Sequence, residues 1–269
     1  MPHPFDESIH LAPTADDTWA GATHPAYANM IGPYGGTTCA VLLRAVLLHA
    51  ARQGDPIALT VNYAAPIADG AYVVQAQPLR TNRSTQHWAM QLAQGGEVCA
   101  SGTAVLAVRR PTWSAPEAEP PVGMPAALEL PRAPAPRHPP WISRYDMRFE
   151  PRQMPRLGGG VEQTHSRTRQ WVRDEPPRAL DYASLAAICD VFFPRVMLRR
   201  GRPAPIGTIS LTTYFHAGPA QLSAQADRHV LGTARGLNFR DGYFDQSAEV
   251  WGDDGTLLAS SHQMVYFRE

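Results

Sequence analysis

Residues 35–48 read GGTTCAVLLRAVLL, an apolar stretch of helical length that opens on two glycines and carries a single charge, Arg44. A helix that is apolar on most faces must be enclosed by other elements before it is buried. The stretch therefore predicts a central helix with a sheet wrapped around it.

Strand signals follow this helix. A strand is expected at residues 57–63, ended by Pro66, and further strands at residues 71–78, 87–93 and 98–108. The Gly95-Gly96 pair marks a hairpin turn between the last two. Residues 1–110 therefore predict one helix followed by an antiparallel meander.

A proline-rich segment comes next, because ten of the 26 prolines lie within residues 111–140. Proline does not fit helix interiors or central strands. The segment therefore predicts an extended linker that separates residues 1–110 from residues 141–269.

The second half repeats the order of the first. It has a helix candidate at residues 179–193 and strand candidates at residues 208–216, 222–230, 244–251 and 257–267. Residues 60–66 align with residues 213–219, and residues 98–101 align with residues 257–260. A single helix wrapped by an antiparallel sheet is the hotdog arrangement. We expect an α+β fold with two fused hotdog domains, whose sheets pack side by side as a pseudo-dimer.

Composition excludes several function classes. The 24 basic residues, all arginine, balance 24 acids, so no overall field attracts nucleic acid or a membrane. Without lysine, Schiff-base catalysis and a phosphate-loop lysine are excluded. The ten histidines lack metal-ligand spacing, and neither a nucleophile elbow nor a dinucleotide loop is present.

The spacing of the cysteines and the length of the apolar runs bear on where the protein is located in the cell. Cys39, Cys99 and Cys189 lie far apart, which suits a reducing environment. The N-terminal residues show no secretory signal, and the longest apolar run is too short to cross a bilayer. We therefore predict a cytoplasmic protein.

Short stretches in both halves carry a resemblance to a known family. They are PYGG at 33–36, LRTNRS at 79–84, RQWVR at 169–173, ICDVFFP at 188–194, TIS at 208–210, FH at 215–216, ARG at 234–236 and LASSHQ at 258–263. In order and spacing the chain resembles the acyl-CoA thioesterase II family of tandem hotdog enzymes. The resemblance implies hydrolysis of an acyl-CoA thioester to free acid and CoA, without a cofactor.

The resemblance also implies a site. The family holds its attacking water with an aspartate, a threonine and a glutamine, which match Asp190, Thr208 and Gln263. One departure is Thr37, where the family often has glutamine after the glycine pair. The acyl chain length therefore does not carry over.

Asp190 can be argued from its neighbours alone, because it interrupts the apolar run at residues 186–193. A buried carboxylate has a raised pKa, which suits a general base. The alternative is structural, since Pro194 cannot donate to the carbonyl of Asp190 and the acid would then only mark a helix end.

Gln263 and Thr208 lie on predicted strands. The Gln263 amide can accept from water and donate to a carboxylate, although an exposed strand residue is the plainer interpretation. Strict alternation places Thr208 with Ser210 and Tyr214, on the face away from the helix, unless the strand twists near Gly207.

Two further groups are candidates for substrate binding. Gly35 and Gly36 at a helix start offer backbone N–H groups to an oxyanion, or form an ordinary tight turn. Arg80, Arg83 and Arg235 suit the phosphates of CoA, or are merely solvated.

Two rival functions stay open at this stage. A non-catalytic acyl-CoA-binding protein would use the same cleft. An enoyl-CoA hydratase of this fold would have an aspartate followed five residues later by a histidine. None of the aspartates has that histidine. Gln263 aligns with Ala104, and residues 35–51 contain no acid, so we expect one hydrolytic site per chain and a homo-oligomer of such chains.

Overall fold

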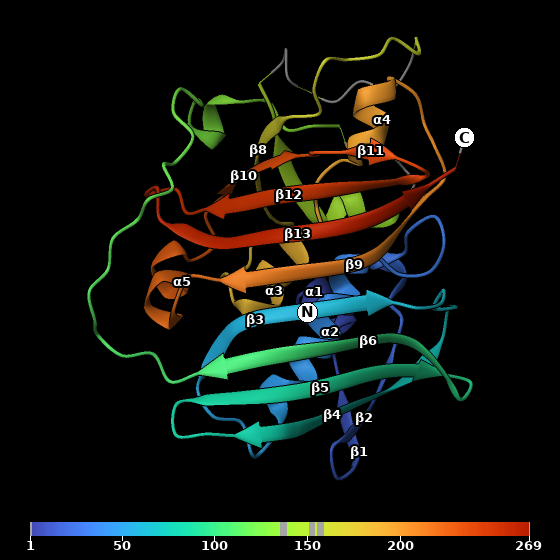
Figure 1. The fold of residues 1–269 in the computed structure, drawn as a ribbon, viewed down its shortest axis with the longest axis vertical. Coiled ribbons are helices and arrows are strands. Elements are labelled where there is room, and N and C mark those ends of the chain that lie inside the picture. Colours follow the sequence, from blue (N-terminus) through green and yellow to red (C-terminus); the bar gives the residue numbers. More distant parts are fainter. Residues whose placement is uncertain (1, 135–138, 151–153, 155–158, 269) are drawn as a thin grey trace.

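Thirteen strands of the computed structural model form one continuous antiparallel sheet (Figure 1). The structure describes residues 2–134, 139–150, 154 and 159–268. The strands follow the spatial order β1-β2-β4-β5-β6-β3-β9-β13-β12-β10-β8-β7, with β11 paired to β12. The first half of the chain supplies one side of this sheet and the second half supplies the other.

The bounds of the elements are as follows. The helices are α1 (Pro4–Ser8), α2 (Gly35–Leu48), α3 (Tyr182–Ile188), α4 (Arg195–Arg200) and α5 (Pro219–Gln225), with short 3₁₀ turns η1 (Pro25–Tyr27), η2 (Ala127–Glu129) and η3 (Pro140–Arg144). The first-half strands are β1 (Ala12–Ala15), β2 (Thr18–Ala22), β3 (Asp55–Tyr63), β4 (Ala71–Thr81), β5 (Thr85–Gln94) and β6 (Glu97–Ala107). The second-half strands are β7 (Tyr145–Arg148), β8 (Thr168–Asp174), β9 (Ile206–Phe215), β10 (Val230–Arg235), β11 (Phe239–Arg240), β12 (Tyr243–Trp251) and β13 (Leu257–Phe267).

The predicted α+β architecture of two fused hotdog units is confirmed. Helix α2 spans the predicted residues, and its apolar side chains are buried from Cys39 to Val46. Helices α2 and α3 contact each other on one face of the sheet, behind the long strands of Figure 1. Among the described residues, no helix is both long and apolar enough to span a bilayer.

The two halves join where β3 pairs with β9. Thr60 lies opposite Thr212, and their hydroxyl oxygens are 3.0 Å apart. Tyr63 pairs with Ala100 and Phe215 pairs with Ala259, so Thr60 and Thr212 are equivalent positions of the repeat. A local twofold axis therefore passes between these two threonines.

This register corrects one of the two predicted alignments. The match of residues 98–101 with 257–260 agrees with the pairing of both halves. The match of residues 60–66 with 213–219 is wrong by one residue, because the second half has an extra residue before its proline. A slip of one residue reverses the face of every side chain in a strand.

Two predicted elements of the second half are also wrong. The helix expected at residues 179–193 is only α3, which Asp181 caps by accepting from the Ser184 N–H at 2.8 Å. Residues 222–230, expected as a strand, are instead the last four residues of helix α5 and the turn after it, and strand β10 begins only at Val230. Pro219 occupies the first turn of α5, and the Gln221 side chain accepts from the Gly218 N–H, an arrangement that favours a helix start.

The proline-rich linker does more than connect the halves. Leu130 is buried with Trp171, Leu231 and Trp251 on the face of the sheet opposite α3, and Met124 packs against them. The Trp171 Nε1–H donates to the carbonyl of Pro125 at 2.8 Å. The limits of residues 1–110, 111–140 and 141–269 as separate units stay a prediction.

We expect the halves not to fold as independent monomers, because separation exposes the β3 and β9 edges and the α2–α3 contact. Residues 1–110 and 141–269, expressed separately, should be insoluble or self-associating by chromatography and NMR. Two soluble, well-dispersed monomers would contradict the fused pseudo-dimer.

Candidate active site

Asp190 lies just beyond α3, where this helix meets the N-terminus of α2. Its backbone N–H bonds to the carbonyl of Ala187, so a tight turn follows the helix and holds the carboxylate in place. The carboxylate accepts hydrogen bonds from the Gly36 backbone N–H and from Nε2 of Gln263. Asp190 as a whole residue is half-buried. Two segments far apart in the sequence therefore orient one acid.

Burial dominates the acid–base behaviour of this carboxylate. Removal of Asp190 from water raises its pKa to about 7, against the smaller lowering by hydrogen bonds from Gln263 and Gly36. The positive end of the α2 dipole acts in the same direction as those hydrogen bonds. A carboxyl group that titrates near neutrality can take a proton from water.

Gln263 is a buried strand residue, so the exposed alternative is wrong for it. Its Nε2–H donates to Asp190, and its Oε1 accepts from Nε2 of Gln246 at 3.0 Å. Gln246 lies opposite Gln263 in the β12–β13 hairpin and is also buried. The two amides and the carboxylate form a chain that fixes the orientation of each member.

Gln246 was not identified from the sequence. The signal was present in the turn at residues 253–255, because the hairpin around it places Gln246 across from Gln263. Two facing glutamines on inward positions would have indicated a polar pair.

Thr208 lies on the same face of the sheet as Gln263, contrary to strict alternation. Thr208 pairs with Val265 and Ser210 pairs with Met264, so Ile209 is an extra residue in β9. This β-bulge returns Thr208 to the face that carries the buried Gln263 and Val265. Its role with the water stays a prediction.

The two glycines allow α2 to approach α3 closely. A Cβ atom on Gly35 would lie 2.7 Å from Oδ2 of Asp190, and one on Gly36 would lie 2.6 Å from the carbonyl oxygen of Ala187. A hydrogen bond also links the two helices here, because the hydroxyl of the neighbouring Tyr34 donates to the Ala187 carbonyl at 2.7 Å. The Gly36 N–H serves Asp190 here, and the oxyanion role of the pair stays a prediction.

Comparisons with known proteins give the family. Residues 24–107 match the acyl-CoA thioesterase N-terminal domain, and residues 116–267 match the acyl-CoA thioesterase C-terminal domain. The chain belongs to the acyl-CoA thioesterase family. It is therefore a thioester hydrolase by class, and the family resemblance seen in the sequence is confirmed.

Solved structures agree with this family. A conserved hot dog protein of unknown function from Alicyclobacillus acidocaldarius is 43% identical, with a TM-score of 0.93 over 100% of this chain and 99% of that one. The acyl-CoA thioesterase II TesB2 of Mycobacterium marinum is 17% identical, with a TM-score of 0.76 over 98% of each chain, and shares the fold. No curated protein matches the sequence.

The thioesterase shows a clear asymmetry between its halves. The equivalent of Gln263 is Ala104, and the equivalent of Gln246 is Trp88, which pairs with Ala104 as Gln246 pairs with Gln263. Both first-half residues are fully buried. An indole ring therefore occupies the place of the polar amides in the first half.

The three arginines predicted for CoA do not meet in one place. Arg80 is exposed and donates to Oδ1 of Asn82, and Arg83 lies in the same β4–β5 hairpin. Arg235 ends β10, with β5, β6, β3, β9, β13 and β12 between it and β4. One phosphate group cannot bridge these two places, although each remains a candidate on its own.

The pH dependence of the thioesterase tests Asp190 and Gln263 together. Because the carboxylate form is the base, kcat/KM should rise with pH and level off above a midpoint near 7. Gln263→Ala should move this midpoint upward, since the lost hydrogen bond had lowered the pKa of Asp190. Asp190→Asn should lower kcat by about two to four orders of magnitude.

Gln91→Ala, at an exposed position of β5, is the matched control and should leave the profile unchanged. A folded Asp190→Asn variant with nearly full activity would remove Asp190 from the mechanism. An unmoved midpoint in Gln263→Ala would remove the glutamine from contact with the base.

Proposed function

We propose that the chain hydrolyses fatty or other acyl-CoA thioesters with a water molecule held by Asp190, Thr208 and Gln263. The observation that carries the proposal is a carboxyl group with a pKa of about 7, hydrogen-bonded by Gln263 and by the N-terminus of α2. General-base activation of water is the chemistry that such a group serves best.

The reaction divides into two steps. Asp190 takes a proton from the water, and the water oxygen bonds to the thioester carbonyl carbon. The tetrahedral intermediate then collapses, the carbon–sulfur bond breaks, and the leaving CoA sulfur receives the proton that Asp190 took from the water. The Gln263 amide orients the nucleophile, while the positive end of α2 at Gly35 and Gly36 stabilises the developing oxyanion.

The rival functions use the same cleft differently. A non-catalytic acyl-CoA-binding protein needs no base, so the raised pKa of Asp190 and the Gln246–Gln263 chain would serve no purpose in it. A hydratase would need a second acid–base group beside the aspartate. Hydrolysis gives a use both to the base Asp190 and to the amide chain that orients it.

A cytoplasmic location and self-association belong to the same proposal. The three cysteines are free and buried, which agrees with a reducing compartment. Large apolar side chains are exposed on the face of the sheet opposite the helices, at Tyr214, Tyr243, Met264 and Tyr266. Such a patch suits contact with a second copy of the chain.

Light scattering tests the self-association. The chain should have the mass of a dimer or larger oligomer at micromolar concentration, and Met264→Glu should lower that mass by placing a charge in the patch. Val73→Glu, at an exposed position of β4, is the control. A native monomer would contradict this part of the proposal.

A hydrolysis assay tests the function itself. Purified protein should release CoA thiol from acyl-CoAs of some chain length, and the Asp190→Ala, Gln263→Ala double variant should release none, because Trp88 and Ala104 leave no second site. Calorimetry with a non-hydrolysable acyl-CoA analogue should give one binding event per chain.

Two equivalent binding events, or full activity in the double variant, would refute the single site. Binding of acyl-CoA without turnover at any chain length would favour the non-catalytic rival.

A further inference from the structure

A tyrosine of the first half lies beside the start of α2 and the carboxylate of Asp190. Tyr63 is the last residue of β3, and it follows the buried Leu59 and Val61 on the inner face of the sheet. A Cβ atom on Gly35 would lie 2.7 Å from Oδ2 of Asp190 and 3.4 Å from the hydroxyl oxygen of Tyr63. The hydroxyl and the carboxylate therefore flank the same point at the first residue of α2.

The Tyr63 hydroxyl ties the first turn of α2 to β3. It donates to the carbonyl of Gly35 at 2.8 Å, and its oxygen lies 3.0 Å from Sγ of Cys39, one turn further along the helix. Because the hydroxyl has a single proton, the Cys39 thiol is the donor in the second contact. Two points on one helical turn are thus fixed to the strand.

The hydrogen bond to Gly35 bears directly on Asp190, because one peptide group serves both. The N-cap residue of α2, Tyr34, makes no side-chain hydrogen bond to the helix start in the described structure. The Gly36 N–H donates to Asp190 instead. The Gly35 carbonyl and the Gly36 N–H belong to the same planar peptide unit, so they can only turn together. Tyr63 therefore holds one end of this peptide, and Asp190 accepts from the other end.

The twofold equivalents show that the fold does not require this hydroxyl. The equivalent of Tyr63 is Phe215, whose ring packs against that of Tyr182, the first residue of α3, with the ring centroids 5.6 Å apart. The start of α3 is capped by Asp181, from its own half. The hydroxyl is thus found beside the helix start that faces Asp190, and its equivalent position has none.

We propose that Tyr63 is a positioning residue of the hydrolytic site, which holds the peptide between Gly35 and Gly36 so that its N–H points at Asp190. The proposal rests on the proposed function of Asp190 as the base. It adds a first-half side chain to a site whose other side chains come from the second half. Tyr63 acts through the peptide and through no contact with the substrate.

The groups around Asp190 leave its own ionisation readable. Among the described residues, the titratable side chains within electrostatic reach of Asp190 come from α2, β3, β7 and the segments beside α2 and α3; they are Tyr34, Cys39, Tyr63, Tyr145 and Cys189. Burial raises the pKa of each of them, so they stay neutral near pH 7. A titration near neutral pH therefore reports the carboxyl group of Asp190.

Tyr63→Phe removes one oxygen and keeps the ring. A loosened Gly36 N–H lowers the pKa of Asp190 less, so the midpoint of kcat/KM against pH should rise by about half a unit to one unit. Below the midpoint, kcat/KM should fall by about three- to tenfold, whereas its high-pH plateau should match that of the native enzyme. A merely structural role would lower kcat/KM by one factor at every pH, because it would reduce the amount of folded protein.

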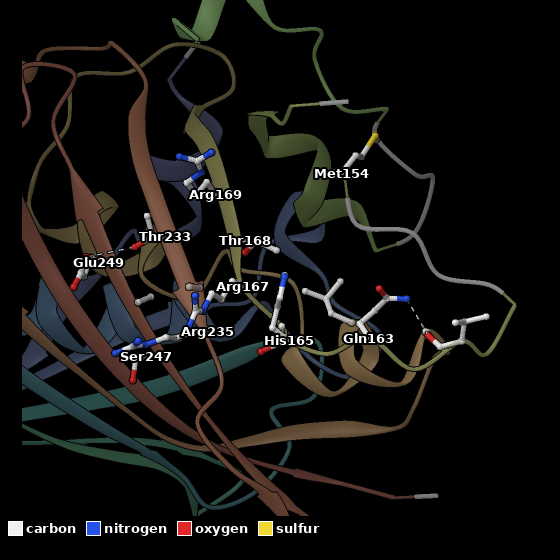
Figure 2. A pocket seen from close by; sticks show the side chains of 16 residues that line it. Met154, Gln163, His165, Arg167, Thr168, Arg169, Thr233, Arg235, Ser247 and Glu249 are labelled. Atoms are coloured by element: carbon white, nitrogen blue, oxygen red, sulfur yellow. Dashed lines mark hydrogen bonds between the residues drawn. The ribbon is translucent and has the colours of Figure 1, made fainter. Parts of the chain in front are cut away.

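Two matched controls lose a hydroxyl elsewhere. Tyr182→Phe removes a buried hydroxyl that donates to the carbonyl of Ala217 at 3.2 Å. Thr233→Val removes a hydroxyl that contacts Oε2 of Glu249 at 3.5 Å, where both residues line a cavity of the second half (Figure 2). Neither control should move the midpoint, because neither hydroxyl touches the start of α2.

NMR measures the same ionisation without turnover. The amide proton of Gly36 should titrate with a midpoint near 7 in the native chain, and about half a unit to one unit higher in Tyr63→Phe. Cys39→Ala removes the thiol that donates to the same hydroxyl, so it should move this midpoint in the same direction by a smaller amount.

An unmoved midpoint in Tyr63→Phe, or an equal loss of kcat/KM at every pH, would overturn the positioning role. If Tyr63→Phe does not fold, an unmoved Gly36 titration in Cys39→Ala would overturn it. A chain whose Gly36 titration moves in Tyr63→Phe, but which hydrolyses no acyl-CoA, would instead refute the proposed function. That outcome would leave the control of the Gly36 hydrogen bond by Tyr63 standing.

Discussion

The antiparallel pairing of β3 with β9 is the constraint on which the site depends. It joins two half-sheets across a local twofold axis at Thr60 and Thr212, and so it sets α2 and α3 side by side. The start of α2 then meets the end of α3, and only glycine fits where they touch. Asp190 therefore receives a backbone hydrogen bond from the other half of the chain.

The same geometry creates a conflict between stability and activity. A carboxylate in this position loses most of its hydration, which opposes ionisation and raises its pKa. Because the folded pKa of about 7 lies above the ordinary value of 3.8, the native state loses stability as pH rises from the lower value to the higher one. The hydrogen bonds that Gln263 and Gly36 donate to the carboxylate offset part of this loss of stability. The base is thus kept near the pH at which it is useful.

The sequence supports the main elements because their signals are local. The apolar stretch that begins at Gly35 gives α2, and an acid among apolar residues indicates Asp190. The features that the sequence does not predict, namely the β-bulge in β9, helix α5 and the role of Gln246, depend on tertiary contacts. Alternation alone does not show the bulge at Ile209, and a mixed segment at α5 becomes helical because Leu222 and Gln225, three residues apart, share a buried face. The role of Gln246 is evident only from its hydrogen bond to Gln263 across the hairpin.

Fusion of two hotdog units explains why the halves can differ. In a symmetric dimer, every substitution appears at both sites, so a tryptophan at the position of Gln246 would fill both of them. In one chain the first half can bury Trp88 against Ala104 and keep its glycine turn, while the second half keeps its amides and its acid. The first half then supplies packing and the start of α2, and the second half supplies the base. Each half is incomplete without the other, which is why the hydrogen bond from Gly36 to Asp190 matters to both.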